Sequence, residues 1–233
     1  MKAMIFAAGL GTRLRPITET IPKALVEFKG KPLIENVINR LITAGVTELI
    51  VNLHHFPEQI KTFVKSKNNF GIRIEFSEEI ELLDTGGGLK KAGWFFNDGN
   101  PFILHNVDIL SDIDLNLMVE THNQSGVLST VAVKKRATSR YFIFDQTNLL
   151  CGWKSVKENK TIMAKEPNGK TQDLAFCGIH VISPQIFPKL TETGKFSIVE
   201  SYLRLAREGE RIAAFRVDEN SWQDIGKVSE LPD

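Results

Sequence analysis

Short apolar runs alternate with amphipathic segments through the first two-thirds of this chain. The amphipathic segments have helical spacing, and runs that are apolar throughout are typical of strands covered on both faces. The alternation therefore predicts an α/β fold with a mixed, mostly parallel sheet and helices on both faces. The expected strands are residues 2–7, 47–53, 72–76, 101–106 and 127–133, and the expected helices are residues 31–44, 57–67, 87–96 and 115–125.

The pattern changes after residue 134, where the apolar runs become shorter and closer together. Two such runs around a polar turn predict an antiparallel hairpin. The long polar stretch at residues 157–173 predicts a loop over the C-terminal edge of the sheet. No repeat or linker interrupts the chain, so we expect a single domain over residues 1–233. The expected elements here are a hairpin at residues 141–144 and 149–153, a strand at 174–182, a helix at 198–207 and a strand at 212–217.

The composition excludes several classes of protein. The 233 residues are 42% hydrophobic and 24% charged, which is ordinary for a globular chain and unlike a disordered one. A formal net charge of +1 gives no overall field for binding nucleic acid or an anionic membrane. No apolar run has the length of a membrane span or secretory signal, and two cysteines make no disulfide framework. We expect a cytoplasmic protein that binds neither nucleic acid nor membrane, and the sequence carries no indication of oligomeric state.

A glycine loop, Gly9-Leu10-Gly11, directly follows the first expected strand. This is the edge at which open α/β sheets bind ligands. Leu14 stands where the dinucleotide-binding fingerprint has its third glycine, which disfavours an NAD-dependent oxidoreductase. No Gly-Lys-Ser/Thr closes the loop, so it is not a P-loop either.

Hydroxyls and cations follow the glycine loop within one short segment. Thr12, Arg13, Arg15 and Lys23 supply side-chain donors close to the backbone amides of the loop. Arginine offers a planar fork to phosphate oxygens, and lysine offers a mobile point charge. The segment therefore predicts a polyphosphate site.

The order of these residues closely resembles the signature of the sugar-1-phosphate nucleotidylyltransferases. The resemblance extends over nearly the whole chain. Its motifs are Gly9-x-Gly11-Thr12-Arg13-Leu14-x-Pro16 with Pro22-Lys23, Leu83-Asp84-Thr85-Gly86-Gly87-Gly88, His105-Asn106-Val107-Asp108, Phe176-Cys177-Gly178-Ile179-His180 and Trp222-Gln223-Asp224-Ile225-Gly226. The resemblance implies a single Rossmann-like nucleotide-binding domain that joins an NTP to a sugar 1-phosphate, with release of pyrophosphate.

Within this family, residues 82–88 look most like the bacterial N-acetylmuramate-1-phosphate uridylyltransferases of cell-wall (peptidoglycan) recycling. That resemblance favours UTP and N-acetylmuramate 1-phosphate as substrates. A mannose- or heptose-1-phosphate guanylyltransferase is the alternative. A non-catalytic sugar-nucleotide sensor on the same fold is a third hypothesis, and its sequence mark would be a missing metal carboxylate or a missing lysine. Seven residues follow Gly226, so we expect no appended domain of the kind some relatives carry.

Two aspartates are the expected ligands of a magnesium ion. Asp108 follows the strand expected at residues 101–106, which places its carboxylate at the same sheet edge as the glycine loop. Asp224 would be read from base rates as a cap or surface residue, and only the family resemblance makes it a ligand. Mg²⁺ prefers oxygen ligands and bridges substrate phosphates. Asp112 and Asp114 are expected to be structural, with Asp114 as a helix N-cap.

The remaining site assignments come from the resemblance. Catalytic roles fall to Arg13, Lys23 and Asp108, and the departing pyrophosphate is assigned to Arg13. Sugar contact is assigned to Glu166 and Gly178, although Lys165-Glu166-Pro167 departs from the Glu-Lys-Pro order of related enzymes, and Lys227-Val228 departs from their Thr-Pro. The expected nucleotide contacts are Ala8, Gly9, Gly11, Thr12, Arg13, Thr85, Gly86, Gly87 and Asn106.

Overall fold

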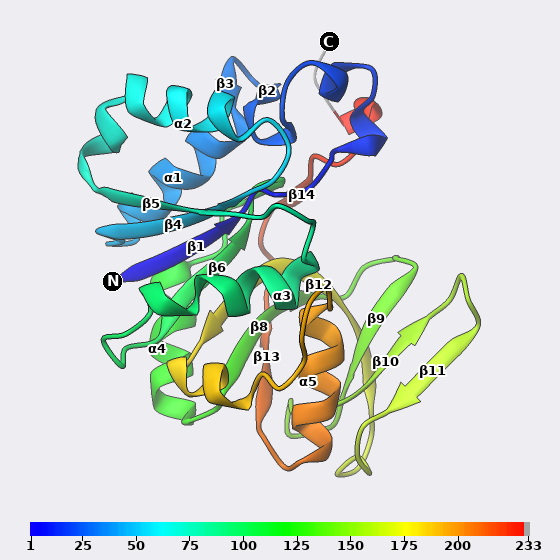
Figure 1. Ribbon diagram of the computed structural model, residues 1–233. Coiled ribbons are helices and arrows are strands. Elements are labelled where there is room, and N and C mark those ends of the chain that lie inside the picture. Colours follow the sequence, from blue (N-terminus) through cyan, green and yellow to red (C-terminus); the bar gives the residue numbers. More distant parts are fainter. Residues whose placement is uncertain (231–233) are drawn as a thin grey trace.

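A central sheet runs through the molecule, with helices on both of its faces (Figure 1). The computed structural model describes residues 1–230. Strands β6, β1, β4 and β5 are parallel neighbours in that order, and β12 joins β6 in the antiparallel direction. The expected mixed, mostly parallel α/β sheet is therefore confirmed. The strands are β1 (Lys2–Phe6), β2 (Glu27–Phe28), β3 (Lys31–Pro32), β4 (Glu48–Leu53), β5 (Arg73–Glu78), β6 (Phe102–Asn106), β7 (Ile109–Ser111), β8 (Ser129–Lys134), β9 (Arg140–Phe144), β10 (Leu150–Ser155), β11 (Lys160–Met163), β12 (Gln172–Ile182), β13 (Ile212–Arg216) and β14 (Trp222–Asp224).

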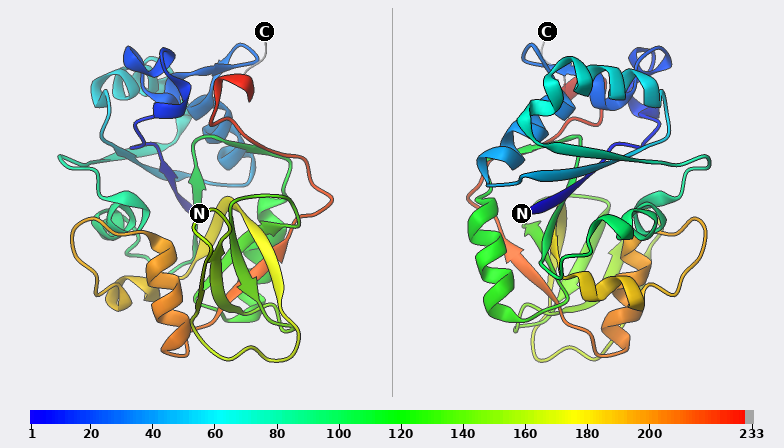
Figure 2. Two further views of the ribbon diagram at one scale, coloured as in Figure 1. Left: turned by 90° about the vertical axis from the view of Figure 1, so that its right-hand side faces the viewer. Right: turned by 60° about the vertical axis from the view of Figure 1, so that its left-hand side comes forward.

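Alternate residues of β1 enter two separate hydrophobic cores, because successive side chains of a strand point to opposite faces. Ala3 and Ile5 pack with helices α1, α2 and α4. Met4 packs on the other face with α3 and α5. Figure 2 shows from two further directions the helices that cover the sheet. The helices are α1 (Leu33–Thr43), α2 (Pro57–Ser66), α3 (Asp84–Lys91), α4 (Leu115–Ser125) and α5 (Ile198–Arg207).

Two expectations about local structure are wrong. The stretch at residues 157–173 is not a loop throughout, because Lys160–Met163 forms strand β11 at the edge of the sheet, paired with β10. Only Ile162 of this strand is partly buried, so it lacks an apolar pattern. The helix expected at residues 87–96 begins earlier, at Asp84, and its last turn, Ala92–Phe95, is a 3-10 helix.

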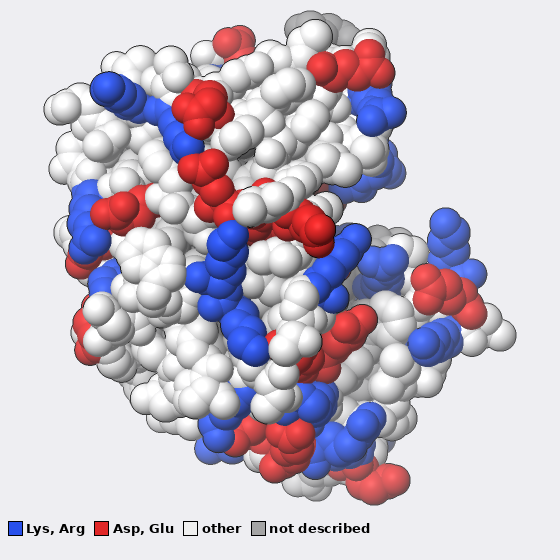
Figure 3. Space-filling model, in the orientation of Figure 1, with Lys and Arg blue, Asp and Glu red and all other residues white. Residues whose placement is uncertain are grey.

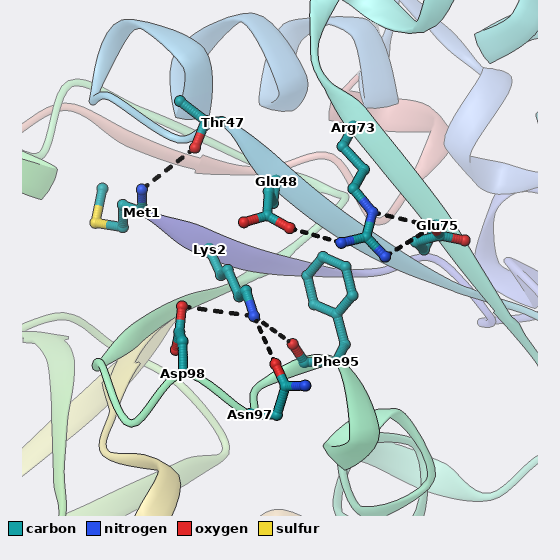
Figure 4. A network of polar contacts seen from close by, with 9 residues as sticks. All are labelled: Met1, Lys2, Thr47, Glu48, Arg73, Glu75, Phe95, Asn97 and Asp98. Atoms are coloured by element: carbon teal, nitrogen blue, oxygen red, sulfur yellow. Dashed lines mark hydrogen bonds and ion pairs between the residues drawn. The ribbon is translucent and has the colours of Figure 1, made fainter.

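The edge of the sheet at the start of β1 holds a closed network of charges (Figure 4). Lys2 is buried, and its Nζ donates to the Phe95 carbonyl at 2.7 Å and to Asn97 Oδ1 at 3.1 Å. Arg73 donates to Glu48 at 2.9 Å and to Glu75 at 3.1 Å. The polar groups of this edge therefore satisfy one another.

Within residues 1–230, no helix has the length and apolar character needed to cross a membrane.

Candidate active site

The C-terminal ends of β1 and β6 open into a cleft of about 340 Å³. Both strands end there because they are parallel neighbours in the sheet. The surface in Figure 3 is hollowed between the upper and lower parts of the molecule, with side chains of both charges at the rim. The cleft is lined by the end of β1 and the glycine loop, by the loops after β5 and β6, and by two lysines. The residues are Phe6, Ala7, Ala8, Gly9, Lys23, Asn52, Glu79, Leu82, Asp84, Thr85, Asn106, Val107, Asp108 and Lys195.

A short antiparallel ribbon brings the two expected metal ligands together. β7 follows Asp108 directly, and β14 ends at Asp224, opposite Ile109. The backbone N–H of Ile225 donates to the carbonyl of Asp108 at 2.8 Å. Neither β7 nor β14 was expected from the sequence, since each is only three residues long. The expectation that Asp108 and Asp224 converge thus has a structural basis.

The carboxyl group of Asp224 is half-buried and only partly compensated by neighbouring charges. Its Oδ1 atom is buried and has no hydrogen-bond partner within residues 1–230. Burial raises the pKa of Asp224 and the carboxylate of Asp108 raises it further, whereas Lys23 and Arg13 lower it by less, so the net shift is upward. A buried acceptor without a donor is costly, so this atom is suited to an external partner that is positively charged.

Two cations lie beside these carboxylates. Lys23 forms an ion pair with Asp108, and both side chains are largely buried, at 11% and 17% exposed. The guanidinium of Arg13 lies beside Gly226, and a Cβ atom built on Gly226 would lie 2.6 Å from Arg13 Nη2 and 2.7 Å from Asp224 Oδ1. Only glycine therefore leaves room for the arginine and the carboxylate together. The structure thus brings Arg13, Lys23, Asp108 and Asp224 together.

The donor set fits a small, hard cation. Asp108 and Asp224 offer carboxylate oxygens, and Asp224 Oδ1 lacks a partner. In the described part of the chain, no group of three or more His, Cys, Asp or Glu side chains is arranged to hold a metal ion. A cation at the two aspartates would therefore need further ligands from substrate phosphates or water, as Mg²⁺ commonly does.

A buried polar chain supports the base of the cleft, and sequence reasoning missed it. The Ala7 amide donates to Asn52 Oδ1 at 2.8 Å, and Asn52 Nδ2 donates to Glu79 Oε1 at 2.7 Å. The other carboxylate oxygen of Glu79 accepts from the Leu83 amide at 2.8 Å. This chain joins the glycine loop, the end of β4 and the start of α3. Asn52 could have been noticed as a polar residue inside an otherwise apolar strand.

The whole glycine triplet, Gly86–Gly88, lies inside α3, which begins at Asp84. The amides of Gly86 and Gly87 donate to the Phe196 carbonyl at 2.9 and 3.2 Å. A Cβ atom on Gly86 would lie 2.4 Å from the Phe196 ring, and one on Gly88 would lie 2.7 Å from Glu79 Oε1. These glycines therefore let neighbouring segments pack closely, and the two amides are already occupied. Thr85 is also an expected nucleotide contact. Unlike Gly86 and Gly87, it lines the cleft.

A second cleft, of about 530 Å³, adjoins the first and shares Asp84, Thr85 and Asn106 with it. One wall is the three-stranded extension β9, β10 and β11, and the other is the first part of α5. Its further lining residues are Arg140, Trp153, Glu158, Lys160, Ile162, Phe176, His180, Ser197, Ile198, Val199, Glu200 and Leu203. The two clefts form one elongated site along the edge of the sheet.

The residues expected to contact a sugar line neither cleft. Glu166 is exposed and lies outside both. Gly178 has a positive φ of 75°, which favours glycine, and a Cβ atom there would lie 3.0 Å from Asn106 Nδ2. Gly178 therefore packs behind Asn106. Lys195, which sequence reasoning missed, lines the first cleft from the segment before α5.

Other expected residues support the loop. Gly11 lies at φ 64°, and its carbonyl accepts from the Thr18 hydroxyl at 2.8 Å. Thr12 and Arg13 belong to the short 3-10 helix that follows.

Asp114 caps α4 by accepting from the Leu117 amide at 2.9 Å, as expected.

Comparison with known proteins agrees with this geometry. The family model described as nucleotidyl transferase matches residues 2–233. The chain is 31% identical to the mannose-1-phosphate guanyltransferase of Candida albicans over 99% of its own length and 62% of that protein. It is 29% identical to the UTP–glucose-1-phosphate uridylyltransferase of Synechocystis over 98% of its length and 61% of that protein. The chain thus spans less than two-thirds of the length of these relatives.

A solved structure has the same fold. HddC from Yersinia pseudotuberculosis, complexed with GMP-PN, superposes with a TM-score of 0.77 over 98% of this chain and 95% of that one. The sequence identity is 22%, so this comparison bears on the fold alone.

Proposed function

Because the chain belongs to the nucleotidyl transferase family, we propose that it transfers a nucleotidyl group from an NTP to a sugar 1-phosphate. One observation carries the proposal. Two cations, Arg13 and Lys23, meet two carboxylates, Asp108 and Asp224, and of these Lys23 and Asp108 line the cleft that begins at the glycine loop. Such a cluster suits a reaction in which charge moves between phosphate groups.

In this reaction an oxygen of the sugar phosphate attacks the α-phosphorus of the NTP, and the bond to pyrophosphate breaks. The attacking oxygen is already anionic, so no protein nucleophile is needed. Catalysis is then mainly alignment and charge neutralisation. Lys23, held by Asp108, holds the phosphates in line, and Arg13 binds the departing pyrophosphate. Gly9 leaves the backbone open to the triphosphate, because no atom lies within 4 Å of a Cβ built there.

Asp108 and Asp224 would hold a magnesium ion. When bound, the ion neutralises negative charge on the phosphates. The partnerless Oδ1 atom of Asp224 and its proximity to Asp108 support this assignment. The base and ribose would occupy the cleft beside Thr85 and Asn106, and the sugar would occupy the second cleft.

UTP and N-acetylmuramate 1-phosphate are the substrates favoured by the resemblance of residues 82–88 to the uridylyltransferases of cell-wall recycling. The second cleft, of about 530 Å³, has room for a substituted amino sugar. A second candidate is GTP with mannose 1-phosphate. It is favoured by the mannose-1-phosphate guanyltransferase of Candida albicans, which is 31% identical over 238 residues.

Pyrophosphate release across a matrix of substrates tests the proposal. UTP, GTP, dTTP and CTP are each combined with N-acetylmuramate, N-acetylglucosamine, glucose and mannose 1-phosphates. We expect the highest kcat/KM with UTP and N-acetylmuramate 1-phosphate. A site that hydrogen-bonds the uracil edge should reject the wrong base more strongly than an apolar contact, which discriminates only about 10–200-fold.

The other outcomes separate the alternatives. The highest kcat/KM with GTP and mannose 1-phosphate would replace the first substrate pair with the second. No pyrophosphate release with any pair, together with tight binding of an NDP-sugar in calorimetry, would identify a sensor instead. The variant Asp224→Asn serves as the control, since release by a contaminating enzyme would survive it.

A further inference from the structure

One buried histidine opens into the second cleft with half of its hydrogen-bonding capacity unused. His180 is 1% exposed and lines this cleft from β12. Its Nδ1 atom lies 2.9 Å from the hydroxyl oxygen of Tyr202 on α5. Among residues 1–230, no protein group is hydrogen-bonded to its Nε2 atom. Tyr202 therefore holds the Nδ1 side of the imidazole, and the Nε2 side is available for a hydrogen bond to a ligand.

The chain of hydroxyls behind His180 has a preferred direction. The Tyr202 oxygen lies 2.8 Å from Ser129 Oγ, and Ser129 Oγ donates to the Val181 carbonyl at 3.3 Å. A carbonyl only accepts, and a serine hydroxyl has one proton to donate. All three contacts are satisfied when Ser129 donates to this carbonyl and Tyr202 donates to Ser129. Tyr202 is then left with an acceptor oxygen for His180, so the proton of the imidazole lies on Nδ1.

The imidazole is also neutral. Burial lowers the pKa of His180 to about 3, and the nearby His105 lowers it in the same direction. With Nδ1 protonated, the Nε2 atom carries a lone pair and is an acceptor.

His122, at the far side of the sheet, differs from His180 in that both of its ring nitrogens have partners. Its two ring nitrogens lie 2.9 and 2.8 Å from the hydroxyls of Thr130 and Ser183.

We propose that Tyr202 is a positioning residue that keeps Nε2 of His180 an unprotonated acceptor in the cleft, where it receives a hydrogen bond from a hydroxyl or amide N–H of the sugar. This inference rests on the proposed function, because it takes the second cleft as the sugar site. His180 thereby favours a sugar with a donor group at that position. A substrate lacking this donor would leave a buried acceptor unpaired, which costs binding.

The first test needs no activity. Nitrogen-15 NMR of the wild-type protein distinguishes a protonated from an unprotonated ring nitrogen of His180. We expect the tautomer with its proton on Nδ1, and in Tyr202→Phe a shift toward the tautomer with its proton on Nε2. His180→Phe assigns the signals. A wild-type His180 protonated on Nε2 would overturn the inference.

The second test separates the two substrates. In Tyr202→Phe and His180→Phe we expect KM for the sugar 1-phosphate to rise about tenfold, the size of one neutral hydrogen bond, with KM for the NTP unchanged. His180→Gln, which retains an acceptor, should recover part of the loss. Tyr141→Phe is the matched control, since the Tyr141 hydroxyl accepts from the Thr138 amide at 3.0 Å and lines neither cleft.

Equal changes of both KM values, or an unchanged KM for the sugar, would contradict a positioning role. Sugar 1-phosphates lacking one hydroxyl at a time identify the donor. Wild type should discriminate against one of them, and His180→Phe should not. Failure of the proposed function is distinguishable, because it appears as absent pyrophosphate release in wild type, whereas failure of this inference appears in the tautomer.

Discussion

Charged side chains are fully paired at the end of the sheet where β1 begins and incompletely paired at the end where β1 finishes. At the edge where β1 begins, Lys2 and Arg73 find partners among carboxylates, an amide and a backbone carbonyl (Figure 4). At the edge where β1 ends, burial and the carboxylate of Asp108 disfavour the charge of Asp224 more than Lys23 and Arg13 favour it. One oxygen of Asp224 has no partner in the described part of the chain.

This difference separates stability from function. Satisfied polar groups stabilise a fold, whereas a buried carboxylate oxygen without a partner is held in place by the rest of the structure. Substrate phosphates and a cation would complete the second set of groups. We therefore expect substitutions at the first edge to change stability alone, and substitutions at the second to change turnover first.

The largest effect is expected for Asp108→Asn. This variant should keep the fold and lower turnover by at least ~10²-fold, the scale for loss of one preorganised electrostatic contact. Steady-state pyrophosphate release at saturating Mg²⁺ measures it. Asp98→Asn is the matched control at the other edge, where Asp98 lies 3.5 Å from Lys2, and it should retain wild-type turnover. Near-normal turnover in Asp108→Asn would exclude a role in catalysis.

Lys2→Met should give the converse result. The substitution removes both hydrogen bonds of the ammonium group and leaves the buried Phe95 carbonyl without a donor. We expect the free energy of unfolding to fall by about 2 kcal/mol, with the activity per folded molecule unchanged. Urea unfolding followed by circular dichroism measures the free energy of unfolding. An active-site titration measures the activity per folded molecule. A stability equal to that of wild type would show that the network at this edge contributes little.

A smaller effect is expected from pH at His122. Burial lowers the pKa of His122 from 6.5 to about 4. Between these values the unfolded chain binds a proton that the folded protein excludes, so stability is full above about pH 6.5 and is lost as the pH falls toward 4. From about pH 7.5 to about pH 5.5 we expect a loss of about 1 kcal/mol from this group. In His122→Asn the pH dependence of unfolding should shrink by that amount, and an unchanged slope would count against a neutral His122.

The smallest effect is a gain in stability from Asp224→Asn. The amide removes the repulsion with Asp108 and does not carry the charge that burial disfavours. We expect the free energy of unfolding to rise by about 0.5 kcal/mol while turnover falls, the usual exchange at strained functional sites. Thermal unfolding without ligand measures the gain. A lower melting temperature would mean that the charge of Asp224 is compensated in the folded protein.

Some of the site could be predicted because local sequence determines it. The glycine loop and Asp108 directly follow apolar strands, and parallel strands place such residues at one edge of a sheet. The hairpin β9–β10 was marked by two apolar runs around a polar turn. Strand β11 was missed because only Ile162 packs inward, so its pattern resembles a surface loop.

Other features depend on contacts between distant segments. Glu79 stands in the acidic run Glu78-Glu79-Ile80-Glu81, which reads as exposed, yet it is 4% exposed because Asn52 and the Leu83 amide donate to it. Gly86 and Gly87 were expected to contact the nucleotide, whereas their amides donate to the carbonyl of Phe196. Asn52 and Phe196 lie far in sequence from the residues they contact, so no local pattern could indicate these two contacts.

The ribbon of β7 and β14 also sets the order in which the site is assembled during synthesis. The strands that carry the glycine loop and Asp108 precede β14 in the chain and therefore emerge from the ribosome before it. Asp224 arrives later and must find β7 across a long separation in sequence, which is a slow kind of contact to form. A nascent chain stopped before residue 222 would contain the glycine loop and one carboxylate but not the other. The two carboxylates can therefore come together only after β14 has been made and has paired with β7.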